Sequence, residues 1–419
     1  MGVTKKTIDR ETRQDQKIST YIVFYFFASV ANATIKTVLP IPDALWSPLS
    51  AAWGVAIVFF MVRCIGEVWQ RQSRLFSYSL GVFAIIYLLS FVNIILRGEP
   101  TDVFLRGTLF LTFVWWIPIG VSCVAVNDKE VLYHTFLSWS YPMALMLYSC
   151  LFFRQTDAVA DPMADPSEEY NMFFGFHMVL PTLLHMNEYL RTHKRTLLVW
   201  SVADVLLLLI YANRGALIPI LFFLFYKYVV ENRGDRNSRI ARMAAIVTAG
   251  VVLVLFSNVI LGGVNELGER IGVKSRTLSM LEAGEIGNRT GRDELFGFAF
   301  DMIGERPLLG YGLGGEYYQI GYRLYGDGLH NVTNAFTPHN GILQNMCSFG
   351  IVGGLSVTLL FLVPLFRLRR IKDEPTYALT LIFGSWTIPM YISASGFLVE
   401  TWAAVFFYLY YFGNKTARR

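Results

Sequence analysis

The stretch SPLSAAWGVAIVFFMV, residues 47–62, contains no charged side chain and ends directly before Arg63. Its length approaches that of a membrane-crossing helix, about 20 residues. Similar runs recur along the chain between short polar connections, and the whole sequence is 54% hydrophobic and 16% charged. Soluble domains have roughly a quarter of their residues charged. The alternation of apolar and polar residues expected of β-barrel strands is absent. Helices are therefore the structure that pairs the backbone N–H and C=O groups within lipid. The sequence therefore predicts an all-α polytopic membrane protein.

About twelve transmembrane helices are expected when each takes about 20 apolar residues. They start near residues 19, 47, 75, 103, 131, 171, 196, 215, 240, 339, 375 and 399. Lysine and arginine concentrate in alternate connections, which the positive-inside rule assigns to the cytoplasm. These basic segments are the N-terminus, Arg63–Arg74, Arg191–Arg195, Lys227–Arg242, Arg367–Lys372 and Lys415–Arg419. Both termini are therefore predicted to be cytoplasmic, and the net charge of +5 marks topology rather than binding of nucleic acid.

One connection is much longer than the others. It covers residues 263–338, between the ninth and tenth helices, on the predicted extracytoplasmic side. Connections of this length are functional or disordered, and the abundance of Phe, Tyr, Leu and Ile argues against disorder. We therefore expect a small folded cap. The predicted organisation is helices 1 to 9 in residues 1–262, the cap in 263–338, and helices 10 to 12 in 339–419.

Two arginines lie where the cap is expected to begin a helix. Arg289 and Arg292 belong to the segment NRTGRD, residues 288–293, which precedes a helical pattern from Glu294 to Glu305. Thr290, with an aspartate three residues later, approximates a capping box and places Arg292 in the first turn. Free backbone N–H groups favour anions there, and a guanidinium adds a bidentate phosphate donor. The segment predicts either an anion-binding arginine or a solvated arginine at a helix start.

Polar residues stand at two further places where the chain meets the extracytoplasmic surface. His339 and Asn340 lie where the tenth helix begins, and Arg214 occupies the short turn between the helices that start near 196 and 215. A neutral histidine at a helix start, close to arginines, suits a general base, although it equally suits an interfacial helix cap. An arginine this close to hydrocarbon either faces a polar cavity or snorkels outward.

The remaining polar patterns also have structural explanations. Four tyrosines in the cap suit either stacking on sugar rings or an aromatic belt at the lipid surface. They are Tyr317, Tyr318, Tyr322 and Tyr325. The sequence GYGLG at residues 310–314 lacks the lysine and the context of a nucleotide loop, so a tight turn is expected. The acidic run Asp157–Glu169 has no nearby histidine and is typical of a solvated loop, so neither metal nor cofactor is expected. Asp204, an acid within a span, is a functional candidate without an evident partner.

The second half of the chain resembles the O-antigen ligase/polymerase superfamily of bacterial membrane proteins. The matching stretches are NRG at 213–215, GR at 291–292 leading into ERPLLGYGLG at 305–314, HNGILQ at 339–344 and GIVG at 350–353. Their order and their placement around one large external loop carry the resemblance, while the first half agrees only in topology. Asn213 departs from the serine that often precedes this arginine in the family.

The resemblance implies a glycosyltransferase of the bacterial inner membrane, most like an O-antigen ligase. Such an enzyme transfers a glycan from undecaprenyl diphosphate to a sugar hydroxyl of lipid A–core at the periplasmic face, and a single displacement without metal would invert the anomeric carbon. By their match to the motifs, Arg214 and Arg292 would contact the donor diphosphate, and His339 would assist the acceptor. Three further residues are expected to help bind substrate: Arg289, Asn340 and Tyr318. The protein is also expected to contact membrane lipid.

Two alternatives to the ligase stay open. A polymerase of the same superfamily would use the same donor, but polymerases often have two substantial external loops, and the loop Arg154–Tyr170 is short. A polysaccharide transporter or flippase is compatible with twelve helices. Motifs gathered around one external cap favour chemistry at that surface over alternating access.

Overall fold

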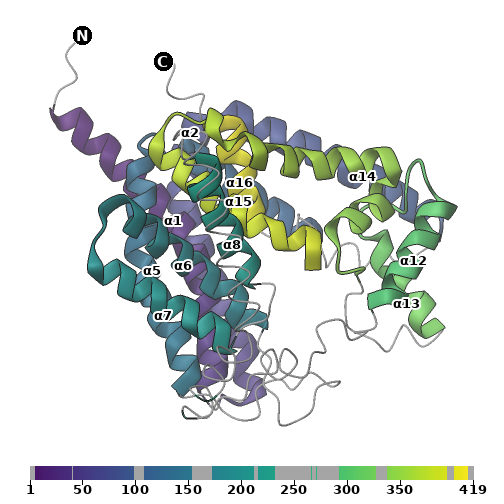
Figure 1. Cartoon of the computed structure of the whole chain (residues 1–419). Helices are drawn as coiled ribbons and strands as arrows, with labels where there is room; N and C mark the ends of the chain where they lie inside the picture. The colour runs from purple at the N-terminus through teal and green to yellow at the C-terminus, as the bar shows by residue number, and fades with distance from the viewer. Residues whose placement is uncertain are drawn as a thin grey trace. The chain divides into compact units, whose positions relative to one another are not determined.

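The fold is helical throughout the part of the chain that the computed structural model describes (Figure 1). Described are residues 5–39, 41–98, 108–152, 172–211, 216–231, 266, 270, 292–326, 337–393 and 401–413. No strand occurs in these ranges. Within these described ranges, three helical stretches are long and apolar enough to cross a membrane: Glu11–Ile35, Ser47–Leu96 and Gly341–Arg370. At this level the prediction of an all-α membrane protein is confirmed.

Helices in the first part of the chain overlap most of the predicted span starts. They are α1 (Lys5–Val38), α2 (Asp43–Leu96), η2 (Thr112–Trp116) continuing into α4 (Ile117–Ala125), α5 (Lys129–Phe152), α6 (Met172–Thr192), α7 (Arg195–Tyr211), and α8 (Leu217–Phe225) continuing into η4 (Tyr226–Glu231). The span predicted from about residue 240 and the acidic loop Arg154–Tyr170 lie outside the described residues.

The connection expected at Arg63–Arg74 contains a kink in α2 at Gln72, where two helical stretches meet. Across Arg63–Arg74 the chain of α2 remains helical except at Gln72, where φ is −136° and ψ is 31°. The connection contains no proline and several strong helix formers, so its sequence does not force a turn.

The described residues from 292 to 413 contain six further helical segments. They are α12 (Arg292–Glu305), α13 (Gly315–Tyr325), α14 (Gly341–Arg367), η6 (Leu368–Arg370), α15 (Glu374–Ser393) and α16 (Thr401–Phe412). The helix predicted from Glu294 to Glu305 is confirmed as α12. Together, α12 and α13 form the described part of the predicted cap; residues 263–265, 267–269, 271–291 and 327–336 lie outside it.

The chain divides into two compact units. The first unit contains residues 1–18, 64–130 and 289–419, and the second contains residues 19–63 and 131–288. In the first unit α16 packs closely on α4, because a Cβ atom at Gly120 would lie 2.1 Å from the ring of Tyr408. The indoles of Trp386 and Trp402 stack between α15 and α16 with their centroids 4.2 Å apart. These helices form an apolar core of that unit.

The second unit has an aromatic core of its own. Phe24 and Phe27 of α1 pack against Trp139 of α5, with centroids 6.2 and 4.8 Å apart. A short turn at His193 reverses the chain between α6 and α7, which pack against each other. All four cysteines of the protein are buried and free, as expected of small core residues.

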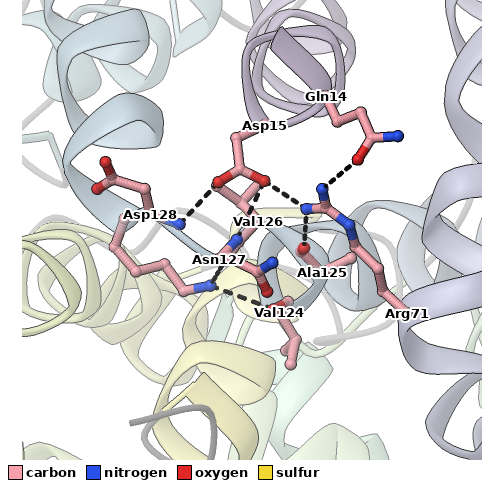
Figure 2. Close-up of polar contacts among 9 residues, drawn as sticks. Gln14, Asp15, Arg71, Val124, Ala125, Val126, Asn127 and Asp128 are labelled. Carbon is pink, nitrogen blue, oxygen red and sulfur yellow. Dashed lines mark hydrogen bonds and ion pairs between the residues drawn. The ribbon is translucent and has the colours of Figure 1, made fainter. Parts of the chain in front are cut away.

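A buried polar cluster in the first unit joins three segments far apart in the sequence. Figure 2 shows the carboxylate of Asp15, from α1, among Arg71 of α2 and the backbone that precedes α5. Asp15 is 2% exposed and accepts hydrogen bonds from Arg71, from Asn127 N at 3.2 Å and from Asp128 N at 2.8 Å. Arg71 also donates to Ala125 O at 2.9 Å.

The same cluster contains a buried lysine beside these carbonyl groups. Lys129 Nζ donates to Val124 O at 3.2 Å and to Val126 O, and burial lowers the pKa of Lys129 to about 8. These contacts join the N-terminal part of α1, α2 and the start of α5 within the first unit.

Candidate functional site

Some of the candidate site residues lie in the described part of the chain, and others lie outside it. Arg214 and Arg289 lie outside the described residues. Arg292 is the first residue of α12, which confirms its place in the first turn of a helix, but its side chain is not among those described. Tyr318 lies in α13, and His339 stands directly before the start of α14. The three helices α12, α13 and α14 pack against one another (Figure 1).

His339 is exposed and has an unusual backbone conformation. Its φ is +47°, in the left-handed region that histidine, asparagine and aspartate tolerate better than most residues. Its backbone N–H donates to Thr337 Oγ1 at 3.2 Å. The next residue, Asn340, is the N-cap of α14, and its Oδ1 accepts hydrogen bonds from Ile342 N at 3.0 Å and Leu343 N at 3.1 Å. The chain thus presents an imidazole at the surface from a rigid helix start.

The N-cap also limits what Asn340 can offer a substrate. Its carbonyl oxygen satisfies two of the N–H groups that every helix start leaves without an intrahelical partner. The amide nitrogen is therefore the group with which Asn340 would contact a substrate.

A small apolar core holds α12 and α13 on α14. Its buried members are Ala299, Met302, Tyr311, Ile320 and Cys347. They come from α12, from the loop after it, from α13 and from α14. Cys347 Sγ also lies 3.6 Å from Ala299 O, to which it donates. The elements that carry Arg292, Tyr318 and His339 are therefore parts of one packed body.

The loop between α12 and α13 is inserted into a break in α14. We call residues 306–314, RPLLGYGLG, the glycine loop. α14 is interrupted at Gly350, where φ is +72° and ψ is 179°. Two carbonyl groups before the break accept hydrogen bonds from the glycine loop: Cys347 O from Tyr311 N at 2.7 Å, and Ser348 O from Gly312 N at 2.9 Å.

A third hydrogen bond runs the other way, from Ile351 N after the break to Pro307 O at 2.7 Å. The expected tight turn is confirmed, since Gly310, Gly312 and Gly314 all have positive φ. Its role is now specific: it replaces hydrogen bonds that α14 loses at Gly350.

Charged side chains surround the ring of Tyr311 in this loop. The guanidinium carbons of Arg97 and Arg306 lie 4.8 and 5.1 Å from its centroid. Tyr311 Oη donates to Glu305, which also accepts two hydrogen bonds of 2.7 Å from Arg323. The hydrogen bond from Tyr311, followed by that from Arg323, lowers the pKa of Glu305. This end of the cap therefore carries arginines around a carboxylate that stays ionised.

Arg97 also contacts this loop, although a lone arginine after an apolar run is a common boundary residue and gives no functional signal in the sequence. Its Nε donates to Asn93 O at 3.1 Å and its Nη2 donates to Tyr311 O. Only the long-range contact with the glycine loop distinguishes it from an ordinary boundary arginine.

A second carboxylate, Glu316 at the start of α13, is buried. It is 1% exposed; its Oε1 accepts from Gln344 Nε2 at 3.0 Å, and its Oε2 has no hydrogen-bond partner within the described structure. Gln344 Nε2 also donates to Tyr317 Oη at 3.1 Å. Burial raises the pKa of Glu316, against the opposing hydrogen bond from Gln344. The belt explanation is wrong for Tyr317, which is 6% exposed, whereas Tyr318 stacks on Tyr322 with centroids 6.1 Å apart.

We expect Glu316 to make the fold less stable as the pH rises. Because its pKa in the folded state lies above the ordinary value of 4.5, its contribution is fully present below pH 4.5 and is lost as the pH rises through the folded-state pKa. Glu316→Gln retains the acceptor oxygen for Gln344 but does not titrate. The thermal midpoint of the wild type in detergent should therefore fall relative to that of the variant between about pH 4 and pH 8.

Glu305→Gln is the matched control with the opposite sign. The pKa of Glu305 is lowered, so its contribution is present above the ordinary pKa and is lost as the pH falls. The difference between wild type and Glu305→Gln should grow as the pH rises toward 4.5 and stay constant above it. A difference between wild type and Glu316→Gln that is constant across this range would contradict the assignment.

Asp204 has partners that the sequence did not reveal. Its Oδ2 lies 2.7 Å from His185 Nδ1, its Oδ1 accepts from Tyr148 Oη, and His185 Nε2 lies 3.0 Å from Ser140 Oγ. Ser140, His185 and Asp204 are each 0% exposed. The order Ser–His–Asp resembles a hydrolase triad, but no substrate can reach buried groups, and Ser140 Oγ donates to Leu137 O at 2.6 Å. The network therefore connects α5, α6 and α7.

The sequence contains only part of the information that pairs His185 with Asp204. The turn at His193 brings residues at similar distances before and after it to one level of the α6–α7 hairpin. The periodic pattern alone gives no reason to prefer this histidine as the partner.

Breaking this network should destabilise the protein strongly. Asp204→Leu leaves the buried His185 and the part-buried Tyr148 without their acceptor, and such a loss costs about 3–5 kcal/mol in the free energy of unfolding. The measurement is the thermal midpoint in detergent. Ser201→Ala is the control, since Ser201 is buried in α7 but donates only to Leu197 O within its own helix, at 2.8 Å, and its loss should cost about 1 kcal/mol. Equal effects of the two substitutions would refute a stabilising role for Asp204.

No group of three or more His, Cys, Asp or Glu side chains among the described residues could hold a metal ion. The acidic run Asp157–Glu169, which was weighed as a metal site, is outside the described part of the chain.

Comparison with known proteins gives one match. The model of a family described as O-antigen ligase matches residues 196–358, a range that begins in α7 and ends in α14 just beyond Gly350. No curated protein and no solved structure matches the chain significantly.

Proposed function

Since residues 196–358 carry the signature of the O-antigen ligase/polymerase superfamily, to which this membrane protein belongs, we propose that it is an O-antigen ligase. It transfers a glycan from undecaprenyl diphosphate to a sugar hydroxyl of lipid A–core at the periplasmic face of a bacterial inner membrane. Both termini are cytoplasmic in this proposal. The observation that carries it is the family match, because the matched range includes Arg214, Arg292 and His339.

His339 is the proposed general base. Its imidazole accepts the proton of the acceptor hydroxyl while that oxygen attacks the anomeric carbon of the donor sugar. The bond from the anomeric carbon to the diphosphate oxygen breaks, and undecaprenyl diphosphate leaves with the bonding electrons. One displacement of this kind inverts the anomeric carbon. The exposed imidazole on the capped start of α14 supports this role.

Arg214 and Arg292 are the proposed ligands of the donor diphosphate. Fixed guanidinium groups bind phosphate oxygens bidentately and stabilise the negative charge that develops on the leaving group. The start of α12 adds the free N–H groups of a first helical turn beside Arg292. Arginines in this role make a metal ion unnecessary. Arg289, Asn340 and Tyr318 complete the proposed substrate contacts.

The lipopolysaccharide banding pattern of a deletion strain tests the proposal. Loss of a ligase should remove every O-antigen band from lipid A–core, while polymerised glycan accumulates on undecaprenyl diphosphate. Loss of a polymerase would instead leave one repeat unit on the core. Loss of a transporter would leave the lipid-linked unit on the cytoplasmic side. Either of the last two patterns would refute the ligase assignment.

A further inference from the structure

The glycine loop exposes two large apolar side chains at its tip. Leu308 is 78% exposed and Leu309 is 79% exposed. They lie between Pro307, whose carbonyl oxygen accepts from α14, and Gly310, whose φ is positive. Two adjacent leucines this exposed in an otherwise well-bonded loop are unfavourable in water. An apolar contact from outside the described part of the chain would therefore stabilise these two side chains.

The attachment of the glycine loop to α14 sets how deep the loop lies in the membrane. Arg367 ends that helix and opens the basic segment Arg367–Lys372, which marks one membrane boundary. Gly350 lies 17 residues before Arg367 in the same helix. At 1.5 Å per residue the break is roughly 26 Å from Arg367, against a hydrocarbon core of about 30 Å. The break, and the glycine loop bonded across it, therefore lie at the opposite boundary of the hydrocarbon.

The surface of α14 beyond the break is already suited to lipid. The segment from the break to Arg367 carries exposed apolar side chains along its length. They are Ile351, Val352, Leu355, Leu359, Leu360 and Phe366. α14 is part of one of the three stretches that are long and apolar enough to cross a membrane. Ile351 N donates to Pro307 O. Leu308 and Leu309 therefore lie next to the end of this apolar surface that is nearest the break.

Non-helical backbone is tolerated at this depth only where its polar groups are paired by protein. The glycine loop meets this condition along much of its length. Gly310 N donates to Arg306 O at 3.2 Å, and Tyr311 N, Gly312 N and Gly315 N also donate to backbone carbonyl groups. The loop can therefore enter the hydrocarbon boundary without the usual cost of unpaired peptide groups.

We propose that the tip of the glycine loop inserts into the membrane, with Leu308 and Leu309 among the acyl chains of the leaflet in which α14 begins. The occupant of this surface is the lipid bilayer itself. Arg306, exposed and stacked over Tyr311, stands one residue before Pro307 and places its charge at headgroup level. The insertion fixes α12 and α13 at the membrane surface. This proposal requires the membrane but not the ligase activity.

Fluorescent probes at three positions of the full-length protein in liposomes test the insertion. The four native cysteines are buried, so a thiol-reactive, polarity-sensitive dye reports on an introduced cysteine, and labelled wild type gives the background. Leu309→Cys is the test position. Val352→Cys, 70% exposed on α14, is the lipid-facing control. Asp301→Cys, whose native side chain is 69% exposed on α12 of the same cap, is the aqueous control.

The expected result is that the probe at residue 309 behaves like that at 352. Its emission should be blue-shifted, and lipids with a nitroxide near the top of the acyl chain should quench it several-fold more than the probe at 301. Aqueous iodide should quench the probe at 301 several-fold more than that at 309. A probe at 309 that iodide quenches as strongly as the one at 301 overturns the proposal. So does a probe shielded from both quenchers, which would indicate a protein partner instead of lipid.

Discussion

Replacing His339 with asparagine should abolish glycan transfer without unfolding the protein. Asparagine tolerates the positive φ of +47° at this position, so the start of α14 can keep its conformation. What is lost is the imidazole, the only group at this residue able to accept the proton of a sugar hydroxyl near neutral pH. A positioned general base contributes about 10²- to 10⁴-fold to a rate. The measurement is transfer by purified protein in liposomes, with the thermal midpoint as the check on folding.

His193→Asn is the matched control for this experiment. His193 is the other described non-glycine residue with positive φ, at +54°, and it is also exposed at a junction between helices. It lies in the turn between α6 and α7, on the side of the membrane predicted to be opposite to His339. His193→Asn should transfer glycan at the wild-type rate. Near-normal transfer by folded His339→Asn would remove His339 from the role of base.

Gly350→Ala should lower the stability of the protein strongly. The backbone at φ +72° and ψ 179° is in a region that essentially only glycine adopts, and such strain costs about 1–3 kcal/mol. A Cβ atom there would also lie 2.3 Å from Leu308 O and 2.7 Å from Pro307 O. Both neighbours are backbone atoms of the glycine loop, so the loop must leave the break in α14. We expect a strongly lowered thermal midpoint and loss of transfer, because α12 and α13 lose their attachment next to His339.

Gly304→Ala provides the control for this effect. Gly304 lies in α12 of the same cap, and a Cβ atom there would have no neighbour within 4 Å. Alanine is favoured over glycine inside a helix by roughly 0.5–1 kcal/mol, so this variant should be at least as stable as wild type. A Gly350→Ala protein with unchanged midpoint and activity would show that the hydrogen bonds between glycine loop and α14 are dispensable.

Local patterns in the sequence predicted the helices well because hydropathy is a property of neighbouring residues. The starts near 19, 131, 171, 196 and 375 each lie in or next to a described helix. The boundary between the second and third spans was harder to predict. The basic connection Arg63–Arg74 contains no proline and forms a kink at Gln72 in place of a loop, because charge sets the side of the membrane while helix propensity sets the backbone.

The candidate site was predictable only in part, and for a similar reason. Motif positions identified His339, Asn340 and the turn in the glycine loop. They did not indicate that the turn repairs a break in α14, nor that Asn340 uses its oxygen as a helix cap. Arg214 and Arg289 lie outside the described residues, so their part in the site rests on the motif match alone.

The sequence by itself determined that this is a helical membrane protein with the motifs of the O-antigen ligase/polymerase superfamily, since apolar run length and short motifs are read locally. Only the tertiary structure decided which polar groups meet. Asp15 with Arg71, His185 with Asp204, Glu316 with Gln344, and the glycine loop with α14 are pairs separated by 19 to 56 residues or joined through backbone atoms. A buried polar group must find a partner in space, and no local periodicity specifies which one.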